Sequence, residues 1–372
     1  MVKHKSLILA LVLLISAGIA CNDGSETKPA PEINTYASIP TPADPSPKGD
    51  RILELDANAP ENEDFNQTIF LARELGAESI RLSVYWDDIE INQGVYNPDP
   101  NWLAIANQYY SAQNLAISLT ISVLDTTETR LPDDLDRISF SDPVMLERFI
   151  GLLEYIKTQL VDVKLVYLAI GNEIDGVLGS DPVAWEEYRD FFEPAAEYAR
   201  ELWPNLPVST KVTYDGLAGS MMENAQDMYR NSDVVMTTYY PLNSDFTVKD
   251  PDVILNDFQT LADLFPKKEI QITEIGYPTS ADNNSSPEKQ AEFIHNMFQA
   301  WDDHHDQITL ISYSWLSDLS PSAVSELETY YGLSGKEFSE FLRTLGLRTY
   351  PDSGENKTGF DIFQTEANLR GW

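Results

Sequence analysis

Short apolar runs alternate with longer mixed segments over most of the chain. Several runs, such as Val166–Ile170, are apolar at nearly every position, as expected of parallel strands buried on both faces. Eight runs therefore predict strands, at Ile52–Leu55, Ser79–Val84, Ala116–Val123, Leu165–Gly171, Val208–Val212, Val234–Tyr239, Ile270–Thr273 and Thr309–Ser314.

The segments between these runs predict helices, at Glu63–Leu75, Trp102–Gln113, Pro143–Val161, Trp185–Leu202, Leu217–Tyr229, Pro251–Phe265, Pro287–His304 and Phe360–Leu369. Strand–helix alternation without a Gly-rich phosphate loop favours an α/β fold of the closed (β/α)8 type, the TIM barrel. Ser317–Tyr350 reads as a long insertion after the eighth strand, with Gly335–Leu345 helical within it.

The N-terminal segment has the pattern of an export signal. Two lysines and a histidine precede the apolar run Leu7–Ala20, which is too short to span a membrane stably. Cys21, the only cysteine, follows at once and predicts acylation of a bacterial cell-envelope lipoprotein after removal of residues 1–20. Ordinary cleavage after Ala20 is the simpler alternative. The Pro-rich residues 21–50 predict an extended tether, and 51–372 predict a single catalytic barrel.

The amino-acid composition limits the classes of partner and cofactor that the protein is expected to bind. The chain has 60 acidic and 25 basic residues, a formal charge of −35, which argues against nucleic acid or an anionic membrane face as a partner. The four histidines, at 4, 295, 304 and 305, supply too little for a zinc cluster or a catalytic triad. No dinucleotide or phosphate motif appears either. The sequence predicts a monomer without metal or cofactor, attached to a membrane only through its lipid.

Candidate chemistry lies where the strands end, because the reacting groups of such barrels sit at the carboxyl ends of the strands. Two glutamates, Glu173 and Glu274, each follow an apolar strand directly, although Glu is a poor strand residue and costly to bury unpaired. Aromatic residues and one arginine join them, namely Arg81, Trp86, Tyr239, Tyr240, Tyr277 and Trp315. Carboxylates, aromatic rings and an arginine at one face are typical of a site that cleaves sugars. Each residue taken alone has a structural alternative; Glu173, for example, could simply begin the next helix.

The motifs at these positions resemble those of known enzymes. Asn172-Glu173 after the fourth strand and Glu274 after the seventh resemble the large clan of retaining barrel glycosidases. Gly171–Ile174, Tyr239–Pro241 and Glu274–Pro278 are similar to the arabinogalactan endo-β-1,4-galactanases. Residues 121–127, after the third strand, depart from that family, which carries a stretch rich in histidine and tryptophan there.

The resemblance implies specific roles. Glu173 would be the general acid/base and Glu274 the nucleophile of a double displacement on a β-linked polysaccharide. Arg81 and either Tyr239 or Tyr240 would hold Glu274. Asn172 would bind the sugar 2-hydroxyl, and Trp315 would form the floor under the reacting ring.

Several alternatives stay open at this point. Trp86 and Asp125 are candidate sugar contacts that could equally be structural. Trp86, Tyr277 and Trp315 on both sides of the glutamates favour cleavage of internal bonds, because aromatic faces stack on successive rings. The insertion Ser317–Tyr350 would oppose that mode if it walled off one end of the groove. A transglycosylase and a non-catalytic carbohydrate-binding lipoprotein are the other functions compatible with these residues.

Overall fold

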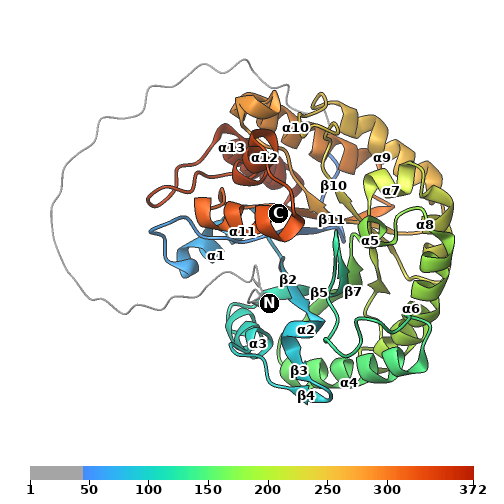
Figure 1. Ribbon diagram of the computed structural model, residues 1–372. Helices are drawn as coiled ribbons and strands as arrows, with labels where there is room; N and C mark the ends of the chain where they lie inside the picture. Colours follow the sequence, from blue (N-terminus) through green and yellow to red (C-terminus); the bar gives the residue numbers. More distant parts are fainter. Residues whose placement is uncertain (1–44) are drawn as a thin grey trace, which may run out of the picture.

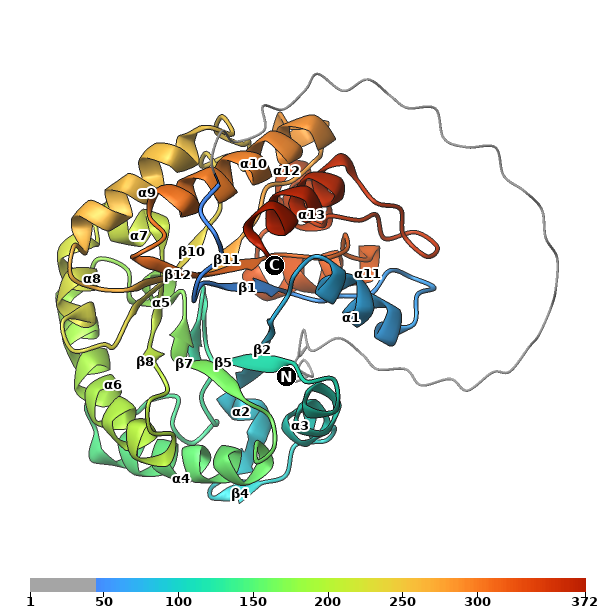
Figure 2. The same cartoon turned by 180° about the vertical axis from the view of Figure 1, so that it is seen from behind.

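The computed structural model describes residues 45–372. Eight parallel barrel strands run in chain order: β1 (Ile52–Leu55), β2 (Ser79–Tyr85), β5 (Ala116–Asp125), β7 (Leu165–Asn172), β8 (Val208–Ser209) continued by β9 (Lys211–Thr213), β10 (Val235–Tyr239), β11 (Ile270–Ile275) and β12 (Ile308–Tyr313). β8 pairs with β7 and β9 pairs with β10, so the interrupted fifth strand joins the two ends of the sheet. The predicted (β/α)8 barrel is confirmed, and Figures 1 and 2 show it from opposite sides.

Helices surround this barrel. The long ones are α1 (Phe65–Glu74), α3 (Trp102–Ala112), α4 (Pro143–Gln159), α6 (Pro182–Leu202), α8 (Met222–Tyr229), α9 (Val253–Leu264), α10 (Pro287–Asp303) and α13 (Thr358–Arg370). α4, α6 and α10 begin alike, with Asp142, Asp181 or Ser286 capping and a proline at the next position. The capping oxygen accepts from a free backbone N–H, and proline lacks the N–H that would otherwise be unpaired, so these dipeptides start helices efficiently.

Shorter helices and strands lie in the loops that follow the barrel strands. They are α2 (Trp86–Ile89), the hairpin β3 (Glu90–Asn92) and β4 (Val95–Tyr96), β6 (Glu128–Thr129), α5 (Ile174–Leu178), α7 (Tyr214–Ala218) and a 3-10 turn, Ala281–Asn283. The single helix predicted over Leu217–Tyr229 is therefore two helices, α7 and α8. The strand predicted over Val208–Val212 is interrupted at Thr210.

The insertion after β12 holds two helices, α11 (Pro321–Tyr331) and α12 (Lys336–Arg343), of which only the second was predicted. α11 starts with the same signal as the barrel helices, Ser320 capping before Pro321, and stops at Gly332 with φ 64°. A side chain in that left-handed conformation is strained, so glycine ends the helix there. Figure 1 shows α11 in front of the barrel, and Figure 2 shows it behind.

The main core fills the space between strands and helices, with side chains such as Leu53, Phe149 and Ile294 fully buried. The barrel interior is different. A small apolar cluster of Tyr167, Ala169, Val234, Met236 and Leu310 fills part of it.

Polar and charged side chains fill the rest of the interior. Glu54 is fully buried and accepts a 2.6 Å hydrogen bond from Ser79. Burial raises the pKa of Glu54. Lys211 is also fully buried. Buried charge is costly, so it marks the interior near the strand ends as the place to look for function.

The N-terminal boundary differs slightly from the expected one. Arg51 donates to the carbonyl oxygens of Ser46 and Pro47 at 2.8 and 3.0 Å, and the Lys48 N–H donates to Arg370 at 2.8 Å. The last residues of the expected tether therefore lie against the barrel. The expected signal, the rest of the tether and Cys21 lie outside the described residues. Within residues 45–372, no helix combines the length and apolar character needed to cross a membrane.

Candidate active site

Glu173 directly follows β7. Its backbone is left-handed, with φ 45°, which is uncommon for a residue with a side chain and is found repeatedly at functional sites. Its carboxylate accepts hydrogen bonds from the hydroxyls of Thr126 and Thr238, both at 2.7 Å. Glu173 stands at the start of α5 but makes no side-chain capping bond, so it does not serve merely to begin that helix. Burial and the neighbouring Glu274 raise its pKa to about 7.

Glu274 lies on β11, and its surroundings are cationic. Its Oε1 lies 2.9 Å from Arg81 Nη1 and 3.5 Å from Lys211 Nζ, and its Oε2 accepts a 3.1 Å hydrogen bond from the Tyr240 hydroxyl. Burial opposes ionisation, but Arg81, Lys211 and Tyr240 outweigh it, so the pKa of Glu274 is lowered. Glu274 is therefore ionised at neutral pH.

The two glutamates thus differ in ionisation. The charge of Glu274 is one cause of the raised pKa of Glu173, so the two carboxyl groups lie close enough to interact. Near neutral pH, Glu173 can hold a proton while Glu274 carries a negative charge. A proton donor and a nucleophile can therefore act on one bond.

Arg81 on β2 holds Glu274 from the barrel interior. It forms ion pairs with Glu274 and with Asp56, which follows β1, and it donates to the Thr273 carbonyl at 3.3 Å. The structure places Arg81 where the sequence predicted it, and it adds Asp56 as the residue that holds the arginine.

Lys211 is a site residue that the sequence analysis missed. It lies on β9, it is fully buried, and its Nζ makes no hydrogen bond within the described chain beyond its 3.5 Å ion-pair approach to Glu274. Burial lowers its pKa, and Glu274 counteracts that. A lysine within a predicted strand, just before Val212, was the signal that could have identified it, because lysine is rarely buried without a partner.

The choice between Tyr239 and Tyr240 is decided by their hydroxyls. Tyr240 bonds Glu274, whereas Tyr239 points away, is 1% exposed and donates to Asp257 at 2.7 Å. The register between β10 and β11 shifts at Thr237/Thr238, which is why strand alternation could not settle the choice. Of the two predicted alternatives, Tyr240 holds Glu274 and Tyr239 does not.

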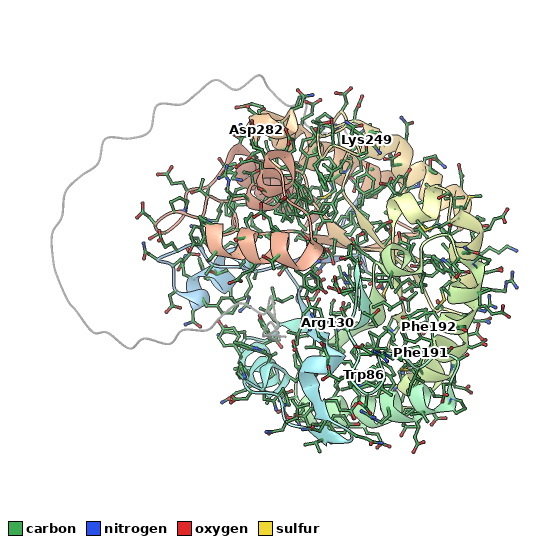
Figure 3. All side chains as sticks on the ribbon, viewed as in Figure 1. Trp86, Arg130, Phe191, Phe192, Lys249 and Asp282 are labelled. Carbon is green, nitrogen blue, oxygen red and sulfur yellow. The ribbon has the colours of Figure 1, made fainter. Side chains whose placement is uncertain are left out.

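The predicted sugar contacts of Trp86 and Tyr277 were wrong, because both side chains are completely buried. Trp86 donates from Nε1 to Glu90 at 2.7 Å, and its ring packs edge-on against Phe149 at 5.2 Å. Phe149 in turn packs edge-on against Phe191 at 5.1 Å, and Figure 3 labels Trp86 and Phe191 in the same part of the fold. Tyr277 donates to the Lys249 carbonyl at 2.7 Å and stacks on Phe293. Both side chains are structural.

Asn172 and Trp315 lie where the prediction placed them. Asn172 ends β7 next to Glu173, and its Oδ1 has no hydrogen-bond partner within residues 45–372. Trp315 follows β12 through a cis peptide bond, is 7% exposed, and its Nε1 likewise lacks a partner in the described part of the chain. Unpaired buried polar atoms of this kind can bind a ligand's hydroxyls.

Asp125 ends β5 and is held by the insertion, which the sequence analysis did not foresee. The Tyr330 hydroxyl donates to Asp125 Oδ2 at 2.6 Å, and Ser122 donates to Oδ1 at 3.1 Å. Burial raises the pKa of Asp125, and Asn172 is among its hydrogen-bonding neighbours. Asp125 therefore couples the insertion to the residues around Glu173.

Metal-ligating side chains do not gather in the described chain: within residues 45–372, no three His, Cys, Asp or Glu side chains are arranged to hold a metal ion.

Comparison with known proteins supports the fold. No protein-family model and no curated protein matches the chain. Among solved structures, GH5_18 from Streptomyces cattleya in complex with GlcNAc has a TM-score of 0.67 at 15% identity, covering 88% of this chain and 81% of that one. Native xylanase 10B from Thermotoga maritima has a TM-score of 0.56 at 14% identity, covering 86% and 96%.

A third match is the exo-β-1,4-mannosidase from Opitutaceae bacterium strain TAV5, with a TM-score of 0.62 at 17% identity, covering 86% of this chain and 59% of that one. The predicted resemblance to barrel glycosidases is confirmed in the fold. At these identities the likeness establishes architecture, so the chemistry is argued from the residues.

Proposed function

We propose that this protein is a retaining β-glycoside hydrolase, with Glu173 as acid/base and Glu274 as nucleophile. The observation that carries the proposal is the contrast between two neighbouring carboxyl groups. Threonine hydroxyls and burial surround Glu173, whereas two cations and a tyrosine surround Glu274. Fold neighbours that include a xylanase and a mannosidase support the same class.

The reaction proceeds in two steps. Glu274 attacks the anomeric carbon while Glu173 donates its proton to the glycosidic oxygen, so the C–O bond breaks and a glycosyl ester forms on Glu274. Glu173, now a carboxylate, takes a proton from a water molecule as that water attacks the anomeric carbon. Glu274 leaves, and the product keeps the β configuration.

The surrounding residues have defined tasks in this scheme. Arg81, Lys211 and Tyr240 keep Glu274 ionised and oriented for attack. Asn172 offers a polar group beside Glu173 for the sugar 2-hydroxyl, and Trp315 offers an apolar face under the ring.

Covalent trapping tests the proposal directly. A panel of 2-deoxy-2-fluoro-β-glycosyl fluorides of glucose, mannose, galactose and xylose should include one that inactivates the enzyme. Mass spectrometry of its peptides should then find the sugar on Glu274. Glu274→Gln should take up no label, and proton NMR of a hydrolysed substrate should show the β anomer first. Initial release of the α anomer would contradict a double displacement.

Sugar transfer uses the same two glutamates. Product analysis over time, with and without an added acceptor sugar, separates hydrolysis from transglycosylation, and we expect hydrolysis to dominate. A purely carbohydrate-binding role would give no covalent adduct at all.

The mode of cleavage needs a separate argument. Internal cleavage of a polysaccharide was predicted from Trp86, Tyr277 and Trp315, but the first two are buried away from the glutamates. Trp315 alone does not make a row of stacking platforms. The support for internal cleavage is therefore lost, and the insertion has to be considered on its own.

We also propose that the protein is exported and anchored by a lipid on Cys21. Cys21→Ser should move it from the membrane fraction to the soluble fraction with unchanged specific activity, because the tether separates the lipid from the barrel. An unmodified Cys21 in the mass spectrum of the wild-type protein would contradict this.

A further inference from the structure

The insertion Ser317–Tyr350 is a compact unit built on the site. Its core consists of Trp315, Leu319, Val324, Phe338, Phe341, Leu342 and Leu345. Trp315 lies just before the insertion, and Tyr240, which bonds Glu274, packs against the same cluster, so this core adjoins the site. Because the unit has its own buried cluster, it can act as a rigid wall.

One end of this wall reaches the second and third barrel strands. Besides the bond from Tyr330 to Asp125, the Tyr330 ring stacks on Tyr85 at the end of β2, with 6.3 Å between centroids. The Arg130 guanidinium lies 3.7 Å from the Tyr85 ring centroid and 5.8 Å from that of Tyr330. Cation–π contacts of this kind add to the stacking. Figure 3 labels Arg130 at this place in the fold.

The other end reaches the sixth and seventh strands. Phe341 packs edge-on against the Tyr240 ring at 5.5 Å, and the Thr279 N–H donates to the Thr344 carbonyl at 3.1 Å. In addition, the Lys357 ammonium pairs with Asp318 at 2.6 Å, which fixes the start of the insertion. The wall thus follows the rim from β10 and β11, past β12, to β2 and β5.

The rest of the rim differs. Among the hydrogen bonds and ion pairs within residues 45–372, none joins the insertion to the segments after β7 and β9, α5 and α7. These two segments bond to each other instead, since Asp175 accepts from the Thr213 hydroxyl at 2.6 Å. The wall therefore ends at Asp125, which pairs with Asn172 beside Glu173, and it leaves the part of the rim that runs from Glu173 over α5 and α7.

In the proposed reaction, the position of the wall determines which end of a substrate chain can extend beyond the site. Glu173 protonates the departing oxygen, so the departing part of the substrate lies on the side of Glu173. The sugar that is attacked lies by Glu274 and Trp315, and the chain beyond its non-reducing end would run into the wall formed by Tyr330 and Asp125.

We propose that the Ser317–Tyr350 insertion closes the non-reducing side of the site, so that the enzyme removes terminal sugars one at a time. Tyr330 is the specificity-determining residue, because it fixes the wall to Asp125. This inference rests on the proposed hydrolase function and names its substrate class: the free non-reducing ends of β-linked chains.

The test uses β-1,3- and β-1,4-linked pentasaccharides of glucose, mannose, galactose and xylose, each carrying 2-aminobenzamide at the reducing end. A second set carries a benzyl ether on the terminal non-reducing sugar. On its preferred uncapped chain, the wild-type enzyme should give labelled products that shorten by one sugar at a time. It should leave the capped chain uncut, since a site that lacks room discriminates strongly against added bulk.

The variants then locate the cause. Tyr330→Ala should raise the rate on the capped chain by about tenfold or more, and Tyr330→Phe, which removes only the bond to Asp125, by less. Tyr198→Ala is the matched control, because its hydroxyl also bonds a carboxylate, Glu154 at 2.7 Å, but on the outer surface of the barrel. It should change nothing.

The outcomes are distinct. If the wild type cuts the capped chain internally, or if Tyr330→Ala and Tyr198→Ala behave alike, the wall is wrong and the hydrolase stands. If no chain in either set is cut and no fluorosugar labels Glu274, the proposed function itself is wrong, and this inference with it.

Discussion

The two sides of the candidate active site contain the same side chain, a glutamate, in opposite electrostatic settings. On the β7 side, the Glu173 carboxylate meets only neutral hydroxyls, those of Thr126 and Thr238. On the β11 side, Glu274 meets Arg81, Lys211 and the Tyr240 hydroxyl. One pKa is raised to about 7 and the other is lowered.

Both groups are glutamates, so the difference between their pKa values comes from the side chains on the neighbouring strands. Burial penalises both carboxylates, so the sign of each net shift depends on whether cations are supplied to offset it. Arg81 on β2 and Lys211 on β9 both form ion pairs with Glu274, whereas Glu173 has no ion pair within residues 45–372. The predictions below remove one element of this difference at a time.

Removing the carboxylates themselves should have the largest effect. Glu274→Ala deletes the nucleophile and should lower kcat by more than the roughly 10²- to 10⁴-fold that proton transfer contributes. Added azide should restore turnover and give an α-glycosyl azide. The measurement is kcat on an aryl β-glycoside, with NMR of the azide product.

The loss of activity in Glu173→Ala should depend on the leaving group of the substrate. Aryl leaving groups of low pKa need no proton, so formation of the glycosyl ester should be nearly normal with them and strongly slowed with an unactivated disaccharide. Azide should then give a β-glycosyl azide. An α-azide from Glu173→Ala, with none from Glu274→Ala, would mean that the two roles are reversed.

Much of this fold could be read from the sequence, because parallel strands buried on both faces give plain apolar runs. Eight strands and the helices between them were predicted in their correct order. Two local features were not predicted. Thr210 interrupts the fifth strand, and helix α11 was missed although Ser320-Pro321 and Gly332 mark its ends.

The site was predicted in part for a different reason. Glu173, Glu274 and Tyr240 stand at or next to strand ends and Arg81 lies within β2, and strands can be located from a pattern. Lys211 and the bond from Tyr330 to Asp125 depend on which side chains point inward and on a contact across 205 positions. Trp86, Tyr239 and Tyr277 show the converse, because a strand end also carries side chains that turn outward into the core.

Removing one cation should have an intermediate effect. Lys211→Met leaves Arg81 in place but raises the pKa of Glu274, because Lys211 helps to lower it. Glu274 must be ionised to attack, so the acid limb of the kcat/KM profile should move to higher pH. A shift of one unit corresponds to about a tenfold loss on that limb.

The profile distinguishes this role from a purely structural one. The alkaline limb, which reports Glu173, should move less than the acid limb. Lys268→Met is the control, since Lys268 donates to the Ser232 carbonyl away from the glutamates. If Lys211→Met only lowered activity uniformly at every pH, then Lys211 would contribute to folding rather than to the ionisation of Glu274.

The smallest change is the loss of one hydroxyl on the other side of the comparison. The bonds from Thr126 and Thr238 stabilise the ionised form of Glu173 and hold its pKa below the value that burial and Glu274 would otherwise give. Thr238→Val keeps the shape of the side chain and removes the hydrogen-bond donor, so the pKa of Glu173 should rise by roughly half a unit to one unit.

Glu173 must be protonated to act as an acid, and activity is lost as pH rises through its pKa, near 7 in the wild type. The alkaline limb should therefore move to higher pH while the acid limb stays in place, the reverse of Lys211→Met. Thr126→Val should do the same, and Thr260→Val, whose hydroxyl donates to the Asn256 carbonyl on α9, should leave both limbs unchanged. An alkaline limb that moved to lower pH in both site variants would mean that these threonines bind the protonated form of Glu173 and help to keep it neutral.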